Sequence, residues 1–206
     1  MRIIVFVAAT AFLVGSCASA PAPTTSTTSS TAAAAPAAPS TIDVTAAMGS
    51  PHVGDPAPDF MLKDQGGADV HLAALKGNVV VLSFVTSWCP YSKAEQPNLA
   101  KLASSYAGKN VKFVAVDIGE NDAGFKAYVD RVPMPMPVVR DRDGKVAESF
   151  TAPGAQPKVT KRSEVPISGN VVVDKDGVIR AIHLGDLAHY DAEMTITKKS
   201  VDELLQ

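Results

Sequence analysis

One stretch of the sequence, Ser83 to Pro97, places a single cysteine among residues that favour thiol chemistry. Cys89 is followed directly by Pro90, and proline commonly occupies the first position of a helix. Cys89 then becomes the N-cap, where its sulfur can accept hydrogen bonds from the free amides of Tyr91 and Ser92. The helix dipole also stabilises a thiolate at this end. We therefore predict that Cys89 is a nucleophile; the alternative is an inert, packed cysteine.

Ser92 stands three residues after Cys89, where redox proteins usually carry a second cysteine. One helical turn separates the two residues, so the Ser92 hydroxyl can donate a hydrogen bond to the Cys89 thiolate. A hydroxyl cannot break a mixed disulfide, because that step needs a second thiolate. We expect Cys89 to capture a substrate and an external thiol to release it. The alternative role of Ser92 is that of an ordinary residue at the start of a helix.

The other cysteine of the sequence, Cys17, ends a segment typical of a secreted bacterial protein. Residues 3–14 form an apolar stretch that is too short to span a bilayer comfortably, as in a signal peptide. The tetrapeptide VGSC that ends at Cys17 resembles the lipobox, in which the cysteine is lipidated and becomes the mature N-terminus. We assign residues 1–17 to a lipoprotein signal peptide and lipobox; the alternative is an ordinary signal peptide. A lipidated Cys17 would leave Cys89 as the only free thiol.

The residues after Cys17 change in composition before the first predicted strand. Residues 18–50 consist mainly of Ala, Pro, Ser and Thr, with Asp43 as the only charge. Such a segment lacks the apolar periodicity of a packed element and is predicted to be a disordered linker. As a flexible coil it would reach roughly 30 Å. It would hold a domain of residues 51–206 clear of a membrane to which acyl chains anchor it.

Periodicity in residues 51–206 predicts alternating strands and helices. Val79–Val85 is a continuous apolar run typical of a central strand, and the helix that follows repeats its apolar residues every three to four positions. The order of elements predicts an α/β domain: one mixed sheet with helices on both faces and an N-terminal hairpin extension. The predicted elements are the hairpin Asp59–Leu62 and Val70–Leu72, strands Val79–Val85, Val111–Val116 and Pro137–Val139, helices Pro90–Tyr106, Ala123–Val132 and Thr197–Leu205, and the hairpin Asn170–Asp174 and Val178–His183. Asp141–Gly144 is predicted to be a turn, and Thr151–Glu164 a polar loop.

Four segments together resemble the thioredoxin-like redoxin family. They are VGDPAPDF from Val53, LAALKGNVVVLSF from Leu72, TSWCPYSKAEQP from Thr86 and VVVDKDGVI from Val171. The nearest branch is that of the membrane-tethered TlpA/ResA-type thiol-disulfide oxidoreductases, which are related to the AhpC/TSA group. The resemblance runs from Val53 to the C-terminus and implies a thioredoxin-like fold. Its most specific part is the pair Trp88-Cys89 after a buried strand, with Pro97 eight residues beyond the cysteine.

The resemblance also implies roles for two further residues. Glu95 lies six residues after Cys89, where TlpA/ResA-type proteins carry an acidic residue that tunes the thiol; the alternative is a solvated surface carboxylate. Pro166 best matches the family's cis-proline, which faces the cysteine. The segment PISGNVVVD holds two more residues than the usual spacing, so an ordinary trans proline remains the alternative. A cis peptide would bring the Val165 backbone beside the sulfur.

Three functions remain open from the sequence. The first is an extracytoplasmic, lipid-anchored thiol oxidoreductase that uses Cys89 alone and is resolved by an external thiol. The second is a one-cysteine peroxidase, since Thr86 stands three residues before the cysteine as in peroxiredoxins, although Leu82 replaces the proline of that family. The third is a redox-inactive binding protein that keeps the fold.

The partners that we expect are protein or small-molecule thiols and disulfides, an external reductant and, through the lipid, a membrane. The chain has 19 Lys and Arg against 21 Asp and Glu, so we expect no nucleic-acid partner. No cofactor is expected. The four histidines have no ligand spacing, so no metal is expected, and the methionines of Met134-Pro135-Met136 are interpreted as packing residues in preference to thioether ligands.

Overall fold

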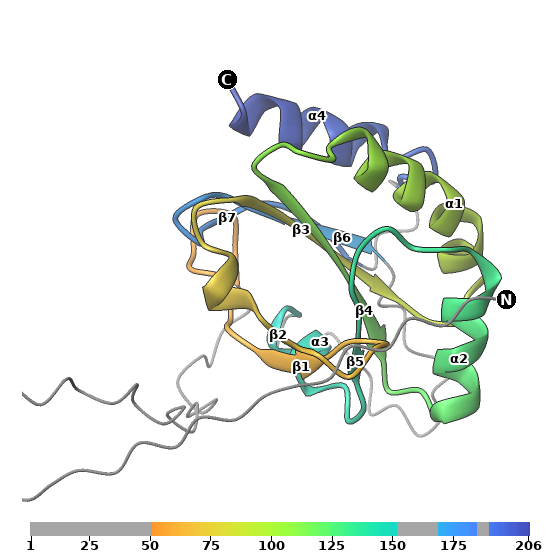
Figure 1. Cartoon of the computed structure of the whole chain (residues 1–206). Helices are drawn as coiled ribbons and strands as arrows, with labels where there is room; N and C mark the ends of the chain where they lie inside the picture. The colour runs from red at the N-terminus through yellow and green to blue at the C-terminus, as the bar shows by residue number, and fades with distance from the viewer. Residues whose placement is uncertain (1–50, 152–168, 185–189) are drawn as a thin grey trace, which may run out of the picture. The chain divides into compact units, whose positions relative to one another are not determined.

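The computed structural model describes residues 51–151, 169–184 and 190–206, which build a five-stranded sheet with helices on both faces (Figure 1). The strand order is β5-β4-β3-β6-β7. Strands β3, β4 and β5 run parallel, β6 is antiparallel to β3, and β7 is antiparallel to β6. The predicted mixed sheet is therefore confirmed. The strands are β3 (Val79–Val85), β4 (Val111–Ile118), β5 (Val138–Asp141), β6 (Gly169–Val173) and β7 (Ile179–Leu184).

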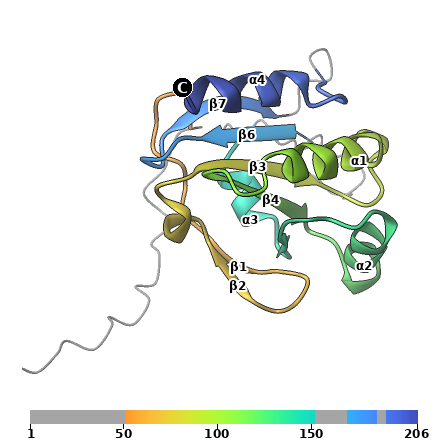
Figure 2. The ribbon, with the colours of Figure 1, turned by 45° about the horizontal axis from the view of Figure 1, so that its top comes forward.

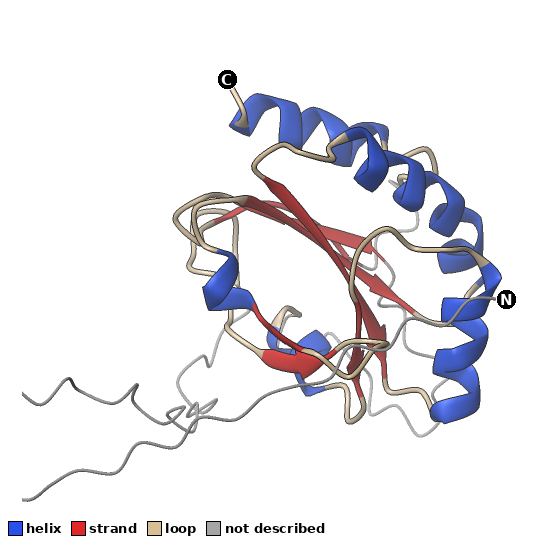
Figure 3. Ribbon diagram, in the orientation of Figure 1, coloured by secondary structure: helices blue, strands red, loops and turns tan. Residues whose placement is uncertain are grey.

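The helices divide between the two faces of this sheet (Figures 2 and 3). The first face is covered by α1 (Pro90–Ser105), α2 (Asp122–Arg131) and α4 (Thr195–Leu204). The second face carries the short helices η2 (Leu72–Leu75) and α3 (Lys145–Ser149) and the hairpin of β1 (Met61–Lys63) and β2 (Asp69–His71). The predicted N-terminal hairpin is thus present. Two hydrophobic clusters, one on each face, form the core.

Strand β3 is central because all seven of its residues are buried. Alternate side chains of a strand point to opposite faces. Accordingly, Val79, Val81 and Val85 join the cluster beneath α1, while Leu82 and Phe84 join the cluster beneath α3. A strand that is buried on both faces lies in the interior of such a sheet, and β3 pairs with β4 on one side and with β6 on the other.

Helix α1 begins where the sequence predicts it to begin. Cys89 is its N-cap residue and Pro90 occupies the first turn. The helix buries Leu99 and Leu102 against the sheet, which accounts for its orientation. Pro97 lies inside the helix on its exposed side. Because proline has no amide hydrogen, the carbonyl four residues earlier loses its helical partner there.

The structure differs from the sequence prediction at a few boundaries and in one element. Strand β4 continues two residues past Val116, because Asp117 and Ile118 still pair with β5. Helix α3 was not predicted, since five residues are too few to show a helical period. Gly144, with a φ of 75°, starts it, and Asp141 Oδ2 accepts a hydrogen bond of 2.8 Å from the Ala147 amide. The predictions for residues 1–17 and 18–50, for Pro166 and for most of the loop Thr151–Glu164 fall outside the described residues.

Candidate active site

Cys89 lies at the junction between β3 and α1 and is half-buried. Its backbone is extended, with φ −72° and ψ 123°, and its carbonyl accepts a hydrogen bond of 3.1 Å from the Lys93 amide. The side chain makes no capping hydrogen bond. The hydrogen bonds predicted from the amides of Tyr91 and Ser92 to the sulfur are therefore absent.

The connector that joins β3 to α1 consists of Thr86, Ser87 and Trp88. The backbone amides of its first two residues each donate a hydrogen bond to a side chain. The amide of Thr86 donates to Ser92 Oγ at 3.2 Å. Ser92 and Thr86 are both buried. Ser92 thus ties the first turn of α1 back to the connector, which is more than the ordinary helix-start role. Its donation to a Cys89 thiolate stays a prediction.

Glu120 holds the second amide of the connector. The Ser87 amide donates to Glu120 Oε1, and the Ser87 hydroxyl donates to Oε2 at 2.6 Å. Glu120 follows β4 and is almost completely buried. The connector is therefore bound by residues from two elements, α1 and the β4–α2 connection. Sequence reasoning missed Glu120, because nothing local to Cys89 points to it.

Glu95 lies two turns into α1 and faces the sheet. Its exposed fraction is 2%, so the alternative of a solvated carboxylate is wrong. Asn170 of β6 donates to Glu95 Oε1 at 2.6 Å and accepts a 2.6 Å hydrogen bond from the Ser83 hydroxyl of β3. Burial raises the pKa of Glu95 to about 7, and Asp191 adds to this rise while the Asn170 amide opposes it. Glu95 is therefore able to exchange a proton near neutral pH.

Two tyrosines, Tyr91 and Tyr190, pack together near the start of α1, and Trp88 directly precedes Cys89 in the chain. The rings of Tyr91 and Tyr190 meet edge to face with their centroids 4.8 Å apart, and the Tyr190 hydroxyl donates to the Tyr91 carbonyl. Burial raises the pKa of Tyr190 to about 12, with further contributions from Glu95 and Cys89. Tyr190 packs against the first turn of α1 through Tyr91. Trp88 and Tyr91 are exposed and give the surface beside the thiol an apolar character.

A second buried carboxylate, Asp117, lies at the end of β4. Its exposed fraction is 0%, and neither of its oxygens has a hydrogen-bond partner among the described residues. Burial raises its pKa to about 7, Glu120 and Asp141 raise it further, and Arg140 lowers it. The hydroxyl of Tyr128 on α2 is also buried with no partner in the described part of the chain. Polar groups are thus concentrated beneath the carboxyl ends of β3, β4 and β5.

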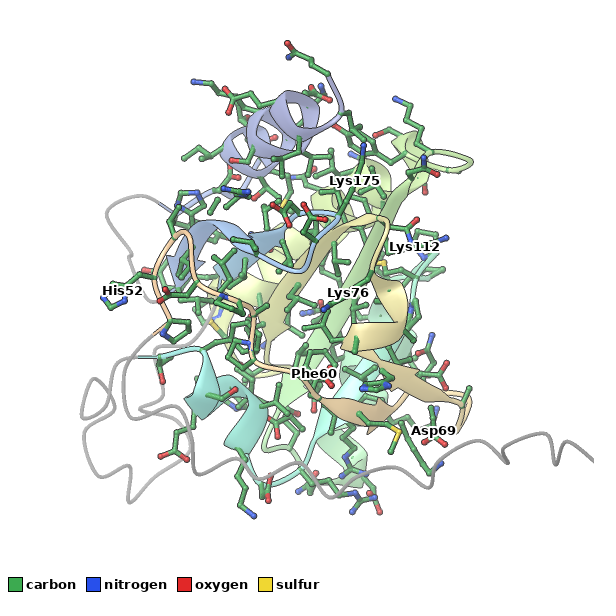
Figure 4. All side chains as sticks on the ribbon, turned by 90° about the vertical axis from the view of Figure 1, so that its left-hand side faces the viewer. His52, Phe60, Asp69, Lys76, Lys112 and Lys175 are labelled. Carbon is green, nitrogen blue, oxygen red and sulfur yellow. The ribbon has the colours of Figure 1, made fainter. Side chains whose placement is uncertain are left out.

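A separate cavity of about 330 Å³ lies at the other end of β3. It is lined by residues of the segment before β1, of η2 and of the β6–β7 turn, including Asp59, Lys76 and Asp174. Figure 4 views this side of the domain, with Lys76 and Lys175 labelled. Val80 also lines the cavity and lies six residues before Thr86. At the rise per residue of a β-strand, this separation places the cavity roughly 20 Å from the start of the connector. It is not part of the thiol site.

The structure gives no sign of a metal centre or a membrane-spanning helix where it describes the chain. Residues 51–151, 169–184 and 190–206 contain no group of three or more His, Cys, Asp or Glu residues suited to a metal ion. In the same ranges no helix is long and apolar enough to cross a bilayer. Met136 is buried in the core and Met134 packs against that cluster, which supports the interpretation as packing residues.

The site brings together five of the residues selected from the sequence. Thr86, Trp88, Cys89, Ser92 and Glu95 all lie on the connector or the first two turns of α1. Pro166 and Cys17 lie outside the described residues. Sequence reasoning missed Asn170, Ser83, Glu120 and Tyr190. A signal existed for two of them, because Ser83 and Asn170 are polar residues in otherwise apolar strands, where a buried polar side chain needs a partner.

Comparisons with known proteins agree with this geometry. A model of the AhpC/TSA family matches residues 53–182. The thiol-disulfide oxidoreductase ResA of Bacillus thuringiensis is 28% identical over 127 residues, which cover 62% of this chain and 66%, just under two thirds, of that relative. ResA of Geobacillus kaustophilus is 28% identical over 141 residues, covering 68% of this chain and 74% of the relative. The exposed lipoprotein thioredoxin of Streptococcus pneumoniae superposes with a TM-score of 0.52 at 25% identity, covering 69% of this chain and 98% of the other.

Proposed function

The chain belongs to the AhpC/TSA family of thioredoxin-like redoxins, and from this premise we propose that it is a thiol-disulfide oxidoreductase that works with one cysteine, Cys89. One observation carries the proposal: a half-buried thiol at the start of α1, with the buried carboxyl of Glu95 on the same helix. Ser92 occupies the place of a second cysteine. The thiol-disulfide oxidoreductase activity for which the ResA relatives are named supports the same reaction class.

The proposed reaction is an exchange in two steps. The Cys89 thiolate attacks one sulfur of a substrate disulfide, a Cys89–substrate disulfide forms, and the other substrate sulfur leaves as a thiolate. An external thiolate then attacks the substrate sulfur of this mixed disulfide. Cys89 leaves as a thiolate and a new disulfide joins the substrate to the external thiol. No electrons remain on the protein, so Cys89 is regenerated without a second cysteine.

Glu95 is proposed to handle the proton in this cycle. A carboxyl whose pKa is about 7 is partly ionised at neutral pH and can accept or return a proton near the thiol. Asn170 donates a hydrogen bond to one of its carboxylate oxygens and so helps to fix its position.

The one-cysteine mechanism is tested by supplying the missing thiol. The substrate is a peptide whose cysteine is joined to glutathione by a disulfide. In the wild type, the mixed disulfide between Cys89 and this peptide should persist until reduced glutathione is added. In Ser92→Cys, the new thiol should release the peptide without an added thiol. Ser104→Cys, on an exposed position of the same helix, is the matched control and should behave as the wild type. Spontaneous release in the wild type, or the absence of a mixed disulfide, would exclude the proposal.

A peroxidase is the second candidate, and Thr86 is the observation that favours it. The Thr86 hydroxyl is buried with no hydrogen-bond partner among the described residues, so it has capacity to bind a ligand oxygen. Consumption of hydrogen peroxide with a thiol donor, lost in Cys89→Ser, would select this function. A biological effect that survives in Cys89→Ala would instead select the redox-inactive binding protein.

We further propose that the domain is tethered outside the cytoplasm by a lipid on Cys17. Two observations support this location: the tetrapeptide that resembles a lipobox, and the similarity to the pneumococcal thioredoxin, which is named as an exposed lipoprotein. The linker of residues 18–50 would then separate the thiol site from the membrane. Labelling with an alkynyl fatty acid should mark the wild type and Cys89→Ser but not Cys17→Ser. Equal labelling of Cys17→Ser would refute the anchor.

A further inference from the structure

Glu120 is distant from Cys89 in the sequence but contacts the connector that carries it. Both of its carboxylate oxygens accept hydrogen bonds from Ser87, one from the amide and one from the hydroxyl at 2.6 Å. Ser87 is only two residues before Cys89, so this paired contact restrains the backbone that aims the thiol.

Glu120 is itself held in place by its neighbours. Arg140 Nη2 donates to the Glu120 carbonyl at 2.9 Å, which fixes the β4–α2 connection against β5. The amide of the preceding residue, Gly119, donates to the Asp141 carbonyl at 2.6 Å. Gly124 leaves the space that the carboxylate occupies, because a β-carbon at this position would lie 1.9 Å from Glu120 Oε2. The carboxylate therefore lies against Gly124 and faces Ser87.

We infer that Glu120 is a positioning residue for the thiol: by holding Ser87 it fixes the connector and hence the direction of Cys89 at the start of α1. The amides of Thr86 and Ser87 are consecutive and follow the last residue of β3. Each is bound by a side chain, Ser92 in the first case and Glu120 in the second. Ser92 belongs to α1, whereas Glu120 lies in the connection between β4 and α2. Glu120 is thus the group that ties the connector to the β4–α2 connection.

This inference rests on the proposed function, because it gives Glu120 a part in the reactivity of Cys89. Two substitutions disturb the contact in different ways. Glu120→Ala removes both acceptors. Gly124→Ala keeps the carboxylate but places a methyl group where Oε2 lies, and alanine is the better helix former at this position in α2. Glu120→Gln keeps an acceptor for the amide and a polar partner for the hydroxyl while removing the charge.

The test is the rate at which iodoacetamide alkylates Cys89 at about pH 7, measured in the full chain with Cys17→Ser in every variant so that one thiol remains. Glu120→Ala and Gly124→Ala should each react roughly tenfold more slowly, whereas Glu120→Gln should stay within about twofold of the wild type. Asp130→Asn, at an exposed position of α2 whose ion pair is with Lys126, is the control and should also stay within about twofold. Thermal unfolding is followed in parallel.

The outcomes separate this inference from the proposed function. A wild-type rate in Glu120→Ala or in Gly124→Ala would overturn the inference. So would a loss in Glu120→Gln equal to that in Glu120→Ala, since the effect would then come from the charge. A slower rate explained entirely by a smaller folded fraction would assign Glu120 a structural role and overturn it too. If the wild type itself reacts no faster than a free model thiol, the proposed function fails instead.

Discussion

The amide of Asn170 donates a 2.6 Å hydrogen bond to the carboxylate of Glu95, and both side chains are buried where α1 crosses the sheet. Asn170 lies opposite Ser83 in the β3–β6 ladder and accepts the hydroxyl hydrogen bond of that residue. The three side chains form a polar chain within an apolar core. Glu95 is the ionisable end of this row of side chains and belongs to the helix that starts at the thiol. A role at the thiol site explains why the protein bears the free-energy cost of burying this carboxyl group.

The first prediction concerns the pH dependence of stability that Glu95 creates. Burial raises its pKa from 4.5 to about 7 in the folded state, so the folded protein binds a proton that the unfolded chain has released. The stabilisation by the protonated Glu95 carboxyl is complete below the pKa of the unfolded state, 4.5. It is lost as pH rises through the folded-state pKa of about 7. Between about pH 5 and pH 8 the wild type should lose on the order of 3 kcal/mol through this group. Urea unfolding at a series of pH values measures the loss.

Glu95→Gln is the variant that isolates this contribution. Glutamine keeps an oxygen that can accept from Asn170 but does not titrate. Its free energy of unfolding should depend less steeply on pH than that of the wild type over the same interval. A variant whose pH dependence matches the wild type would show that Glu95 does not titrate in this range. Exposed Glu203→Gln in α4 is the matched control and should leave the pH dependence unchanged.

Asn170→Ala should both destabilise the domain and change the titration of Glu95. The substitution leaves the buried Glu95 carboxyl and the Ser83 hydroxyl without their partner, at a cost of about 1–3 kcal/mol. It also removes the hydrogen bond that lowers the Glu95 pKa, so that pKa should rise above 7. Urea unfolding and a carboxyl NMR titration measure the two effects. An unchanged or lower Glu95 pKa would contradict the described contact.

Ser92→Ala should loosen the junction between β3 and α1. The Thr86 amide loses its buried acceptor, which costs about 1–3 kcal/mol of unfolding free energy. Hydrogen exchange of the Thr86 amide should accelerate as well, because its protection depends on the closed contact. Ser104→Ala, which removes an exposed hydroxyl farther along α1, should be nearly neutral. Equal stability of the two variants would argue against the tie between Ser92 and the connector.

Asp117→Asn should stabilise the protein at alkaline pH and have little effect at acid pH. Asp117 is buried without a hydrogen-bond partner in the described structure, and its pKa of about 7 means that it is charged at about pH 8 but protonated at about pH 5. The amide removes a buried negative charge that faces Glu120 and Asp141. Chemical unfolding of wild type and variant at both pH values tests this. Destabilisation at the higher pH would show that the Asp117 charge is compensated.

Much of the fold could be predicted because its elements have strong local signals. The apolar run of β3 coincides with the predicted bounds, Val79–Val85, and the period of α1 identified the buried residues Leu99 and Leu102. Shorter elements were harder to predict. Helix α3 has too few residues for a period, and its start depends on the left-handed Gly144 and on the Asp141 side chain. The end of β4 at Ile118 is decided by its pairing with β5.

The candidate site divides in the same way. The spacing of Cys89, Ser92 and Glu95 could be read from the sequence. Each lies three residues after the one before, and residues at this interval in a helix lie on the same side of it. The hydrogen bonds predicted for the Cys89 sulfur are not formed, because residue type and spacing along the chain do not fix the orientation of a side chain. Whether Glu95 faced water or the core was equally undecided by its position in the sequence.

The sequence by itself therefore determined the order of the elements, the place of the thiol at a helix start and the hydroxyl one turn beyond it, because these follow from residue type and spacing along one segment. Only the tertiary structure decided that Glu95 is buried against Asn170 and that Glu120 binds Ser87. These partners are 75 and 33 residues apart in the chain. The burial and hydrogen bonding that set the chemistry of a carboxylate depend on how the sheet brings distant segments together, and no local pattern encodes that contact.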